Sequence, residues 1–370
     1  MIKEITISKR RLRSIVHDSV KSAETIDLVY VNDKEEGICR QKKHDKFIYK
    51  MQEQEIDDEQ ILLRIKKLAI PPSWNNVWIC TLPNGHLQAT GYDLKNRKQY
   101  RYHISWSILR NHTKFYNLYN FGNTLPSMRK QIHADMTLPG LPLRKVLATI
   151  ISLIQYTSIR IGNETYEKQY GSLGITTLKD RNVSIHGSDV RFSFKGKKGV
   201  YHDIKLRNKK LARIIAQCRD IPGKELFQYY DENGERHSVD SGKVNEYIKE
   251  ISGGIHFTAK DFRTWTGTIY ALKTFNKLGT CDTEVEAKKK IMQGLDIVSK
   301  HLGNTPAVCK KYYVHPLILE YYENSKLFSY CAALPYQNND KNIENQTVEE
   351  KILLKLLEEA EPIKIFNKTN

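Results

Sequence analysis

The sequence predicts an α+β protein in which a small β-rich N-terminal domain precedes a larger, mainly α-helical domain with a small antiparallel sheet. Before residue 103, short alternating runs are bounded by turn residues, which is typical of strands. After residue 104, apolar residues recur mainly at helical spacing. We expect domains at 1–103 and 104–330, followed by an acidic helical extension at 331–370.

The N-terminal region contains one helical run and one predicted hairpin. Residues 57–68 carry apolar side chains at helical spacing, and the prolines at 71–72 end this run. Residues 77–82 read as a strand, residues 83–85 supply a turn, and residues 86–90 return as a second strand. The next segment, 91–103, interleaves cations, amides and aromatic rings.

The predicted helical domain contains a long apolar helix. Residues 143–154 place Leu, Val and Ile side chains on one face, with Pro142 near the start. We expect Gly162 to end this helix, which places Arg160 in its last turn, and Asn163 to begin the next element.

Three short alternating runs then predict a small sheet, at 183–185, 190–194 and 200–204. The last two are joined by Lys-Gly-Lys-Lys-Gly at 195–199, a hairpin loop with lysines at its tip. A solvated turn explains such a loop as well as a functional one does.

Helix boundaries are well marked toward the C-terminus. Thr258 and Asp261 flank one helix start, and a capping box at 283–286 begins another helix, which Gly303 ends. Thr305 and Pro306 open a further helical segment that Pro316 limits. Residues 337–340 resemble a linker, and a capping box at 347–350 starts an acidic helix. Its apolar stripe should dock onto the body of the protein or onto a partner; it consists of Ile352, Leu353, Leu356 and Leu357.

The charge balance favours a polyanionic partner. The formal net charge is +17 and the pI is near 9.4. Nucleic acid is favoured over a membrane surface because the basic clusters lie in several different elements and not on one amphipathic helix. These clusters are at 9–13, 195–198, 205–210, 288–290 and 310–311. The segment at 91–103 fits a surface that contacts phosphates and base edges, but an edge strand with packed tyrosines fits it equally.

The cysteines and the apolar runs point to a reduced, cytoplasmic protein. The six cysteines form no CxxC pair, so neither a zinc site nor a disulfide framework is indicated. The first residues lack an apolar signal core, and no apolar run approaches transmembrane length. We expect no membrane association.

Two segments carry the chemistry. One runs from Leu302 to Pro316 and contains Tyr312 and Tyr313 beside lysines; the other runs from Lys260 to Thr268 and contains an arginine. A phenolate can attack a phosphodiester when fixed cations hold the charge that builds on the phosphate. The sequence has no phosphate-binding GxxxxGK[ST] loop and no acidic cluster typical of paired magnesium ions. We therefore expect neither a nucleotide, a metal nor any other cofactor.

Together these two segments resemble the active-site region of type IB DNA topoisomerases, especially the small poxvirus-like and bacterial enzymes. The N-terminal segments at 71–74, 84–91 and 97–100 also resemble the N-terminal domain of the bacterial family. The resemblance thus covers nearly the whole chain up to about residue 325.

The resemblance implies a set of catalytic residues. Tyr313 has the family spacing from Asn304 and would be the nucleophile that forms a 3′-phosphotyrosyl link, with Tyr312 as the competing neighbour. Arg263 and Arg160 match the two family arginines, whose planar guanidinium groups suit phosphate oxygens.

The hairpin lysine and Asn304 complete this set. Lys197 matches the family general acid for the leaving 5′ oxygen, and Lys195 and Lys198 are competing assignments. Proximity to two arginines should ease its loss of a proton. Asn304 stands where eukaryotic and poxvirus enzymes have histidine, whereas the bacterial branch resembles this chain. An amide donates a hydrogen bond but carries no charge.

The resemblance also implies double-stranded DNA as the partner of a monomeric clamp, with a hinge near residues 103–106. The expected DNA contacts are Lys260, Gln88, Tyr92, Arg97, Tyr100 and Tyr102. The activity implied is relaxation of supercoiled DNA by transient single-strand cleavage and religation. A tyrosine recombinase and a non-catalytic DNA-binding protein are the alternatives. Taken singly, each arginine could be an ion-pair partner and each tyrosine a packed side chain.

Overall fold

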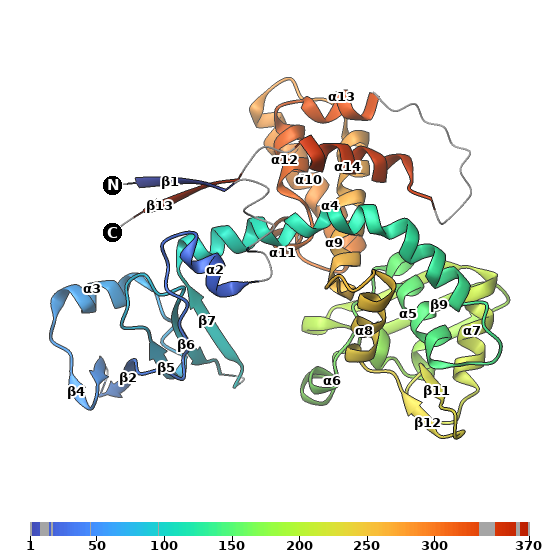
Figure 1. The fold of residues 1–370 in the computed structure, drawn as a ribbon, viewed down its shortest axis with the longest axis horizontal. Coiled ribbons are helices and arrows are strands. Elements are labelled where there is room, and N and C mark those ends of the chain that lie inside the picture. Colours follow the sequence, from blue (N-terminus) through green and yellow to red (C-terminus); the bar gives the residue numbers. More distant parts are fainter. Residues whose placement is uncertain are drawn as a thin grey trace. The chain divides into compact units, whose positions relative to one another are not determined.

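The computed structural model describes most of the chain, which folds into two compact units (Figure 1). The described residues are 2–7, 15, 18–44, 46–94, 96–332, 345–359 and 363–368, with the backbone alone at 2–7, 112, 114, 116 and 363–368. The N-terminal unit comprises residues 1–116 and 361–370, and the C-terminal unit comprises residues 117–360. The basic cluster expected at 9–13 and the linker expected at 337–340 lie outside the described residues.

A six-stranded antiparallel sheet forms most of the N-terminal unit, in the order β4-β3-β2-β5-β6-β7. The expected hairpin is confirmed, because β5 and β6 pair antiparallel. The helix α3 (Glu59–Lys67) lies where a helix is predicted, with Asp58 capping its first N–H groups. The strands are β2 (Ile38–Lys43), β3 (Lys46–Met51), β4 (Gln54–Glu55), β5 (Asn75–Ile79), β6 (Leu87–Tyr92) and β7 (Lys98–Tyr102).

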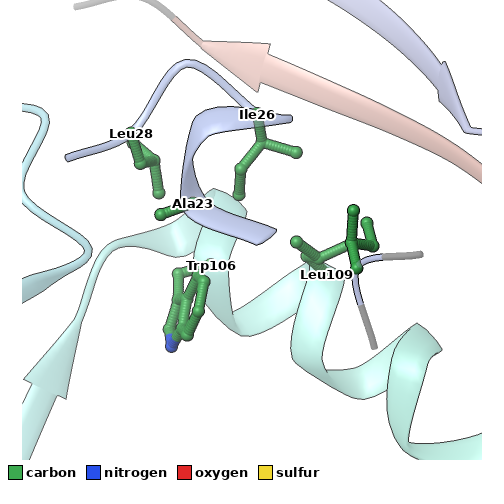
Figure 2. Close-up of a cluster of buried hydrophobic side chains, with 6 residues drawn as sticks. Ala23, Ile26, Leu28, Trp106 and Leu109 are labelled. Atoms are coloured by element: carbon green, nitrogen blue, oxygen red, sulfur yellow. The ribbon is translucent and has the colours of Figure 1, made fainter. Parts of the chain in front are cut away.

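The start of helix α4 (Ile104–Asp135) belongs to the N-terminal unit. Figure 2 shows how the short helix α2 (Ser19–Glu24) and the turn after it pack on this first part of α4. Buried side chains from both segments form one cluster, because both faces are apolar. The cluster contains Ile15, Ala23, Ile26, Leu28, Trp106 and Leu109.

The division between the units falls inside α4, between residues 116 and 117. The chain termini also pair with each other, since β1 (Ile2–Ile7) runs antiparallel to β13 (Ile363–Lys368). The acidic extension is therefore shared, with its strand in the N-terminal unit and its helix in the C-terminal unit.

The C-terminal unit is mainly helical, and its small sheet has the order β10-β9-β8. Its sheet strands are β8 (Val183–His186), β9 (Asp189–Lys195) and β10 (Tyr201–Arg207), with a separate hairpin of β11 (Gln228–Tyr230) and β12 (Arg236–Ser238). Its helices after α4 are α5 (Leu143–Thr157), α6 (Glu164–Tyr170), α7 (Lys209–Arg219), α8 (Ser241–Ile251), α9 (Ala259–Leu278), α10 (Glu284–Leu302), α11 (Pro306–Tyr312), α12 (Pro316–Glu323), α13 (Lys326–Ala332) and α14 (Val348–Glu359). This architecture confirms the predicted α+β class, with its β-rich N-terminal part, mainly helical second part and small antiparallel sheet.

One helix end differs from the prediction. Helix α5 stops at Thr157, and Ser158 takes the left-handed conformation, with φ of 55°. The prediction of Gly162 as the helix terminator was therefore wrong, and Arg160 lies beyond the helix instead of in its last turn. Gly162 instead has φ of 98° in the link after the helix, where a Cβ would lie 2.9 Å from the Thr176 hydroxyl and 3.1 Å from the Thr177 hydroxyl. The positive φ and the close approach of residues 176–177 therefore favour glycine here, and helix capping does not explain it.

The other predicted caps are confirmed. Asp261 Oδ2 accepts from the Thr258 N–H and hydroxyl at 2.8 Å each, at the start of α9. Gly303 ends α10 with φ of 59°. Thr305 caps α11, whose first residue is Pro306.

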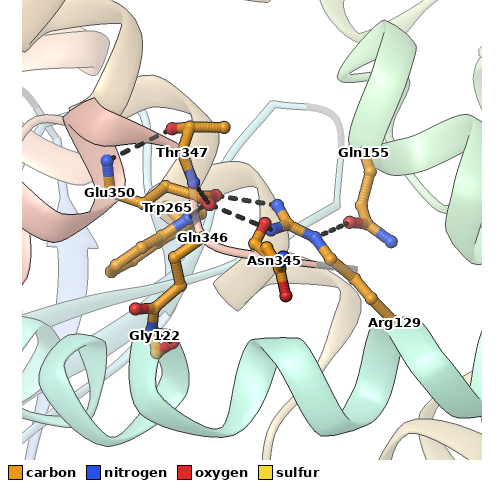
Figure 3. Close-up of polar contacts among 8 residues, drawn as sticks. All are labelled: Gly122, Arg129, Gln155, Trp265, Asn345, Gln346, Thr347 and Glu350. Carbon is orange, nitrogen blue, oxygen red and sulfur yellow. Dashed lines mark hydrogen bonds and ion pairs between the residues drawn. The ribbon is translucent and has the colours of Figure 1, made fainter. Parts of the chain in front are cut away.

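The acidic helix α14 docks onto the body of the C-terminal unit, one of the two expected alternatives. Figure 3 shows Glu350 of α14 facing Arg129 of α4 and Trp265 of α9. Its Oε2 and Oε1 accept from the Arg129 guanidinium at 2.9 and 2.7 Å, and Oε1 also accepts from the indole N–H of Trp265 at 2.9 Å. Among the described residues, no helix combines the length and apolar character needed to cross a membrane.

Candidate active site

Helix α9 buries an arginine whose donors are only partly satisfied. Arg263 lies one turn after the Thr258–Asp261 cap, and its side chain is 3% exposed. Its Nη2 donates to the carbonyl of Leu302 at 3.1 Å. Its Nε and Nη1 are buried and have no hydrogen-bond partner among the described residues. Buried donors are almost always paired in folded proteins, so this guanidinium lacks an acceptor that an anion would supply.

Tyr313 lies directly beside this guanidinium. The centroid of its ring is 5.1 Å from Cζ of Arg263. A glycine on α9 permits the approach, because a Cβ at Gly267 would lie 2.8 Å from the Tyr313 carbonyl oxygen and 3.1 Å from its Cβ. The Thr268 hydroxyl also donates to the same carbonyl at 3.1 Å. The backbone of Tyr313 is thus fixed against the helix that carries Arg263.

Electrostatics favour the phenolate of Tyr313. Burial by itself would raise the pKa of this phenol, but the charges of Arg263 and Arg160, then a hydrogen-bond contribution from the Arg263 side chain and a smaller part from the charge of Lys260, outweigh it and lower the pKa below the ordinary value. Burial lowers the pKa of Arg263 to about 10, so this guanidinium remains protonated at neutral pH. The neighbouring Tyr312 is 38% exposed.

Arg160 reaches the same place from a different segment. The link after α5 is held by backbone hydrogen bonds from Ile175 to Arg160 at 2.7 Å and from Thr176 to Ile161 at 2.8 Å. From there, Nη2 of Arg160 donates to the Gly303 carbonyl at 3.3 Å and to Oδ1 of Asn304.

The C-terminal end of α10 is therefore what brings the two arginines together. Its terminal carbonyls carry partial negative charge, and they accept from one arginine at Leu302 and from the other at Gly303. The Asn304 amide lies in the same turn, and its Nδ2 donates weakly to the Leu302 carbonyl at 3.4 Å. Four of the five predicted catalytic residues thus meet at one turn: Tyr313, Arg263, Arg160 and Asn304.

The fifth, Lys197, lies on the loop between β9 and β10. The side chain is exposed, and its Nζ is 5.6 Å from the centroid of the Tyr166 ring on α6. The competing Lys195 and Lys198 are exposed as well, and Lys198 has φ of 61°. The geometry does not choose among the three lysines.

Sequence reasoning missed His202 of β10, which lies against this site. A Cβ at Gly303 would be 2.2 Å from its Cε1, and burial together with the charges of Arg160 and Arg263 lowers its pKa to about 4. A single histidine in an alternating strand gives no signal, because only the fold brings it to the turn after α10.

The predicted DNA contacts occupy different environments. Lys260 is exposed in the first turn of α9. Tyr100 and Tyr102 are 47% and 45% exposed, and their rings stack at 5.8 Å on the edge strand β7. Arg97 forms an ion pair with Asp93 at 2.6 Å, and Tyr92 is half-buried at the end of β6.

Gln88 is the exception, since it is 3% exposed. Its Nε2 donates to the carbonyl of Gly85 at 2.8 Å, and its Oε1 accepts from Arg64 at 3.0 Å. These bonds hold the turn between β5 and β6, so a contact with DNA would require them to break.

One group of metal-ligand type side chains gathers within the described part of the chain, on the hairpin of β11 and β12. It consists of Asp231, Glu235 and His237, whose ligand atoms lie within 4.8 Å of one another. His237 and Asp231 pair with each other at 2.8 Å, which explains the grouping without an ion.

Comparison with known proteins identifies the family. Residues 97–331 match the sequence profile described as the catalytic core of eukaryotic DNA topoisomerase I. Residues 46–93 match the N-terminal domain of bacterial DNA topoisomerase IB.

Named relatives agree with these profiles. The DNA topoisomerase 1B of Acanthamoeba polyphaga mimivirus is 35% identical over 302 residues, which cover 79% of this chain and 89% of the relative. The DNA topoisomerase 1B of vaccinia virus (strain Copenhagen) is 24% identical, over 62% of this chain and 70% of the relative. Among solved structures, the XerH site-specific recombinase bound to palindromic difH covers 55% of this chain and 51% of its own, with 15% identity and a TM-score of 0.36, too low to support an argument.

The family profile spans more than half of the chain, and the mimivirus relative exceeds 30% identity over most of both chains. Neither points to a recombinase or to a DNA-binding protein without activity. This chain belongs to the type IB DNA topoisomerase family.

Proposed function

We propose that this chain relaxes supercoiled duplex DNA through a transient 3′-phosphotyrosyl link at Tyr313, without a nucleotide or a metal ion. The observation that carries the proposal is the pair of buried, unpartnered donors on Arg263, beside a phenol whose pKa is lowered. A scissile phosphate offers the acceptor oxygens that these donors lack.

In the proposed cleavage step, the phenolate oxygen of Tyr313 attacks the scissile phosphorus as the bond to the 5′ oxygen breaks. Arg263 and Arg160 hold the non-bridging oxygens, on which negative charge builds. Asn304 donates from Nδ2, which has a second N–H besides the weak one to Leu302, while Arg160 fixes its Oδ1.

The departing 5′ oxygen needs a proton, and we assign this to Lys197. All three lysines of this loop are exposed and can reach bound DNA without breaking a buried contact, and the match to the family motif favours Lys197 over Lys195 and Lys198. The deprotonated lysine then accepts the proton back when the 5′ hydroxyl attacks the phosphotyrosine. The phosphodiester energy is kept in the covalent link, so relaxation between the two steps requires no other energy source.

We further propose that the N-terminal unit grips the duplex from its exposed edge strand, so that the two units act as a clamp. Residues 103–106 do not form the expected hinge of this clamp, because they lie within the N-terminal unit and Trp106 is buried in its core. Support comes from the exposed, stacked rings of Tyr100 and Tyr102 on β7. Lys98 lies on the same strand, and its ammonium would have to exchange its ion pair with Asp33, at 2.5 Å, for a phosphate. Arg97 and Tyr92 flank this strand. Gln88 is left out because its amide is engaged inside the sheet. One copy of the chain in the cytoplasm suffices for this mechanism.

The test is to trap the protein on a nicked oligonucleotide and map the attached residue. We expect the adduct on Tyr313, and we expect Tyr313→Phe to abolish plasmid relaxation while duplex binding survives. Tyr312→Phe is the matched control, because it removes the adjacent, more exposed phenol and should leave relaxation unchanged. An adduct on any other side chain, or turnover that a chelator abolishes, would contradict the proposal.

A further inference from the structure

His202 links the hairpin that carries Lys197 to the turn that holds the arginines. It pairs with Phe194 across β9 and β10, and the two rings stack with centroids 5.0 Å apart and planes inclined by 16°. The imidazole is therefore held flat by the strand that leads into the Lys197 loop.

Two glycines enclose the ring from opposite elements. A Cβ at Gly196, the residue before Lys197, would lie 2.7 Å from Cδ2 and Nε2 of the imidazole. A Cβ at Gly303, the residue before Asn304, would lie 2.2 Å from Cε1 and 3.0 Å from Nδ1. No side chain fits at either position with the ring in place, so the imidazole contacts both backbones directly.

The ring can occupy this place because it is neutral. Burial first, and then the charges of Arg160 and Arg263, lower the pKa of His202 to about 4. A protonated imidazole would add a third positive charge beside the two arginines. The neutral ring fills the space without opposing them, and it leaves the donors of Arg263 free for the phosphate.

We propose that His202 is a positioning residue: its ring is the spacer that sets the distance between the Lys197 loop and the Gly303–Asn304 turn. Lys197 and the phosphate-binding groups lie on different elements, and the ring is packed between the residues that precede each of them. Loss of the ring should therefore misplace the proton donor while the arginines and Tyr313 keep their own supports. This inference rests on the proposed role of Lys197 as general acid.

Leaving-group chemistry separates this role from a merely structural one. A strand with sulfur in place of the bridging 5′ oxygen leaves as a thiolate, which needs no proton. We expect His202→Ala to cleave the ordinary strand about 10- to 100-fold more slowly in single turnover, less than the effect of removing a general acid altogether. On the thio strand, its rate should stay within about threefold of the parent.

Two reference variants keep the outcomes distinct. Lys197→Ala should cleave the ordinary strand even more slowly than His202→Ala, and its rate should also recover on the thio strand. Arg263→Ala should cleave both strands slowly. If Lys197→Ala is equally slow on both, the acid has been misassigned and the inference fails with it. If Lys197→Ala is rescued and His202→Ala is not, the inference alone is wrong.

The glycine on the hairpin offers a second, independent measurement. Gly196 has φ of −93°, so alanine is conformationally acceptable there and collides only with the ring. Gly196→Ala should slow cleavage of the ordinary strand, and combining it with His202→Ala should cost less than the sum of both effects. If the effects of the two substitutions on the cleavage rate are strictly additive, the proposed spacer role of His202 is wrong.

His202→Phe decides the case if the alanine variant does not fold, and it also tests the imidazole itself. A neutral ring of similar shape should retain most of the activity on the ordinary strand. A Phe variant that melts like the parent, yet is slow on both strands, would show that the imidazole acts on the phosphate itself, and the spacer role would be wrong.

Discussion

Two arginines on neighbouring helices of the C-terminal unit, Arg263 buried and Arg129 half-buried, have opposite surroundings. Arg129 of α4 donates from both terminal nitrogens to Glu350 and from Nε to Gln155, at 2.7 to 3.3 Å. Arg263 of α9 donates from Nη2 to a single carbonyl, and within the described part of the chain its other two nitrogens have no acceptor. The fold supplies an acceptor for each nitrogen of the Arg129 guanidinium, whereas Arg263 requires a bound anion to supply acceptors for Nε and Nη1.

This difference distinguishes structural from functional charge. A buried ion pair with its hydrogen bonds made contributes little net stability, but breaking it leaves an uncompensated charge. A buried cation with unmet donors costs free energy in the empty protein and is justified only by what it binds. Glu350 also accepts from Trp265, two residues after Arg263 on the same helix. The C-terminal extension thus braces α9, the helix that carries the phosphate-binding arginine.

The largest expected effect is on Arg263. Arg263→Ala should slow single-turnover cleavage about 100- to 1,000-fold, because it removes preorganised donors from the transition state. Arg263→Lys should recover little, since an ammonium cannot reproduce the planar fork. The melting temperature should change little, because removing a buried cation with unmet donors offsets the loss of its packing and of its hydrogen bond to Leu302. If Arg263→Ala strongly lowered the melting temperature but cleaved at the parental rate at low temperature, Arg263 would be a structural arginine and not a catalytic one.

Glu350→Gln should have the converse effect, lowering the stability of the fold while leaving DNA cleavage nearly unchanged. Arg129 would lose its carboxylate, and we expect the free energy of unfolding to fall by about 3 kcal/mol, measured by urea denaturation. The control is Lys351→Gln, an exposed position on the same helix, which should fall within about 0.5 kcal/mol of the parent. Cleavage well below the melting temperature should be nearly unchanged. Equal losses of stability in the two variants would mean that the ion pair between Arg129 and Glu350 does not stabilise the packing of α14.

The pH dependence should follow the phenol. With the thio strand, which isolates attack from leaving-group protonation, the rate should rise with pH through an inflection that lies below the ordinary phenol pKa of about 10, since the pKa of Tyr313 is lowered. Arg263→Ala should move this inflection to higher pH, because the positive charge that favours the phenolate is gone. An inflection near pH 6.5 is not expected, because an amide at Asn304 does not titrate and the pKa of His202 is about 4.

The smallest effect concerns an exposed cation on the same helix. Lys260→Ala should weaken duplex binding uniformly across sequences and reduce the slope of log affinity against log salt by about 1, as loss of one phosphate contact does. Lys277→Ala, at the exposed far end of α9, is the control and should leave the slope unchanged. Affinity that does not vary with salt would argue against a basic DNA surface altogether.

Much of the fold could be predicted because the signals are local. The caps at Thr258, Thr305 and Gly303 appear where the residue types place them, since each acts within one turn of its own helix. The hairpin of β9 and β10 is equally local. The pairing of Arg129 with Glu350 could not be predicted, because more than two hundred residues separate them in the sequence.

By itself, the sequence determined the order of helices and strands, the basic character and the residues that match the family, because each depends on residue type and short spacing. Tertiary structure alone decided that Arg160 and Arg263 share the end of α10, that Gln88 is enclosed, and that a neutral His202 separates two glycine backbones. The physical reason is that burial and the pairing of charges are properties of groups brought together from distant segments. No local pattern encodes which donors will be left without an acceptor.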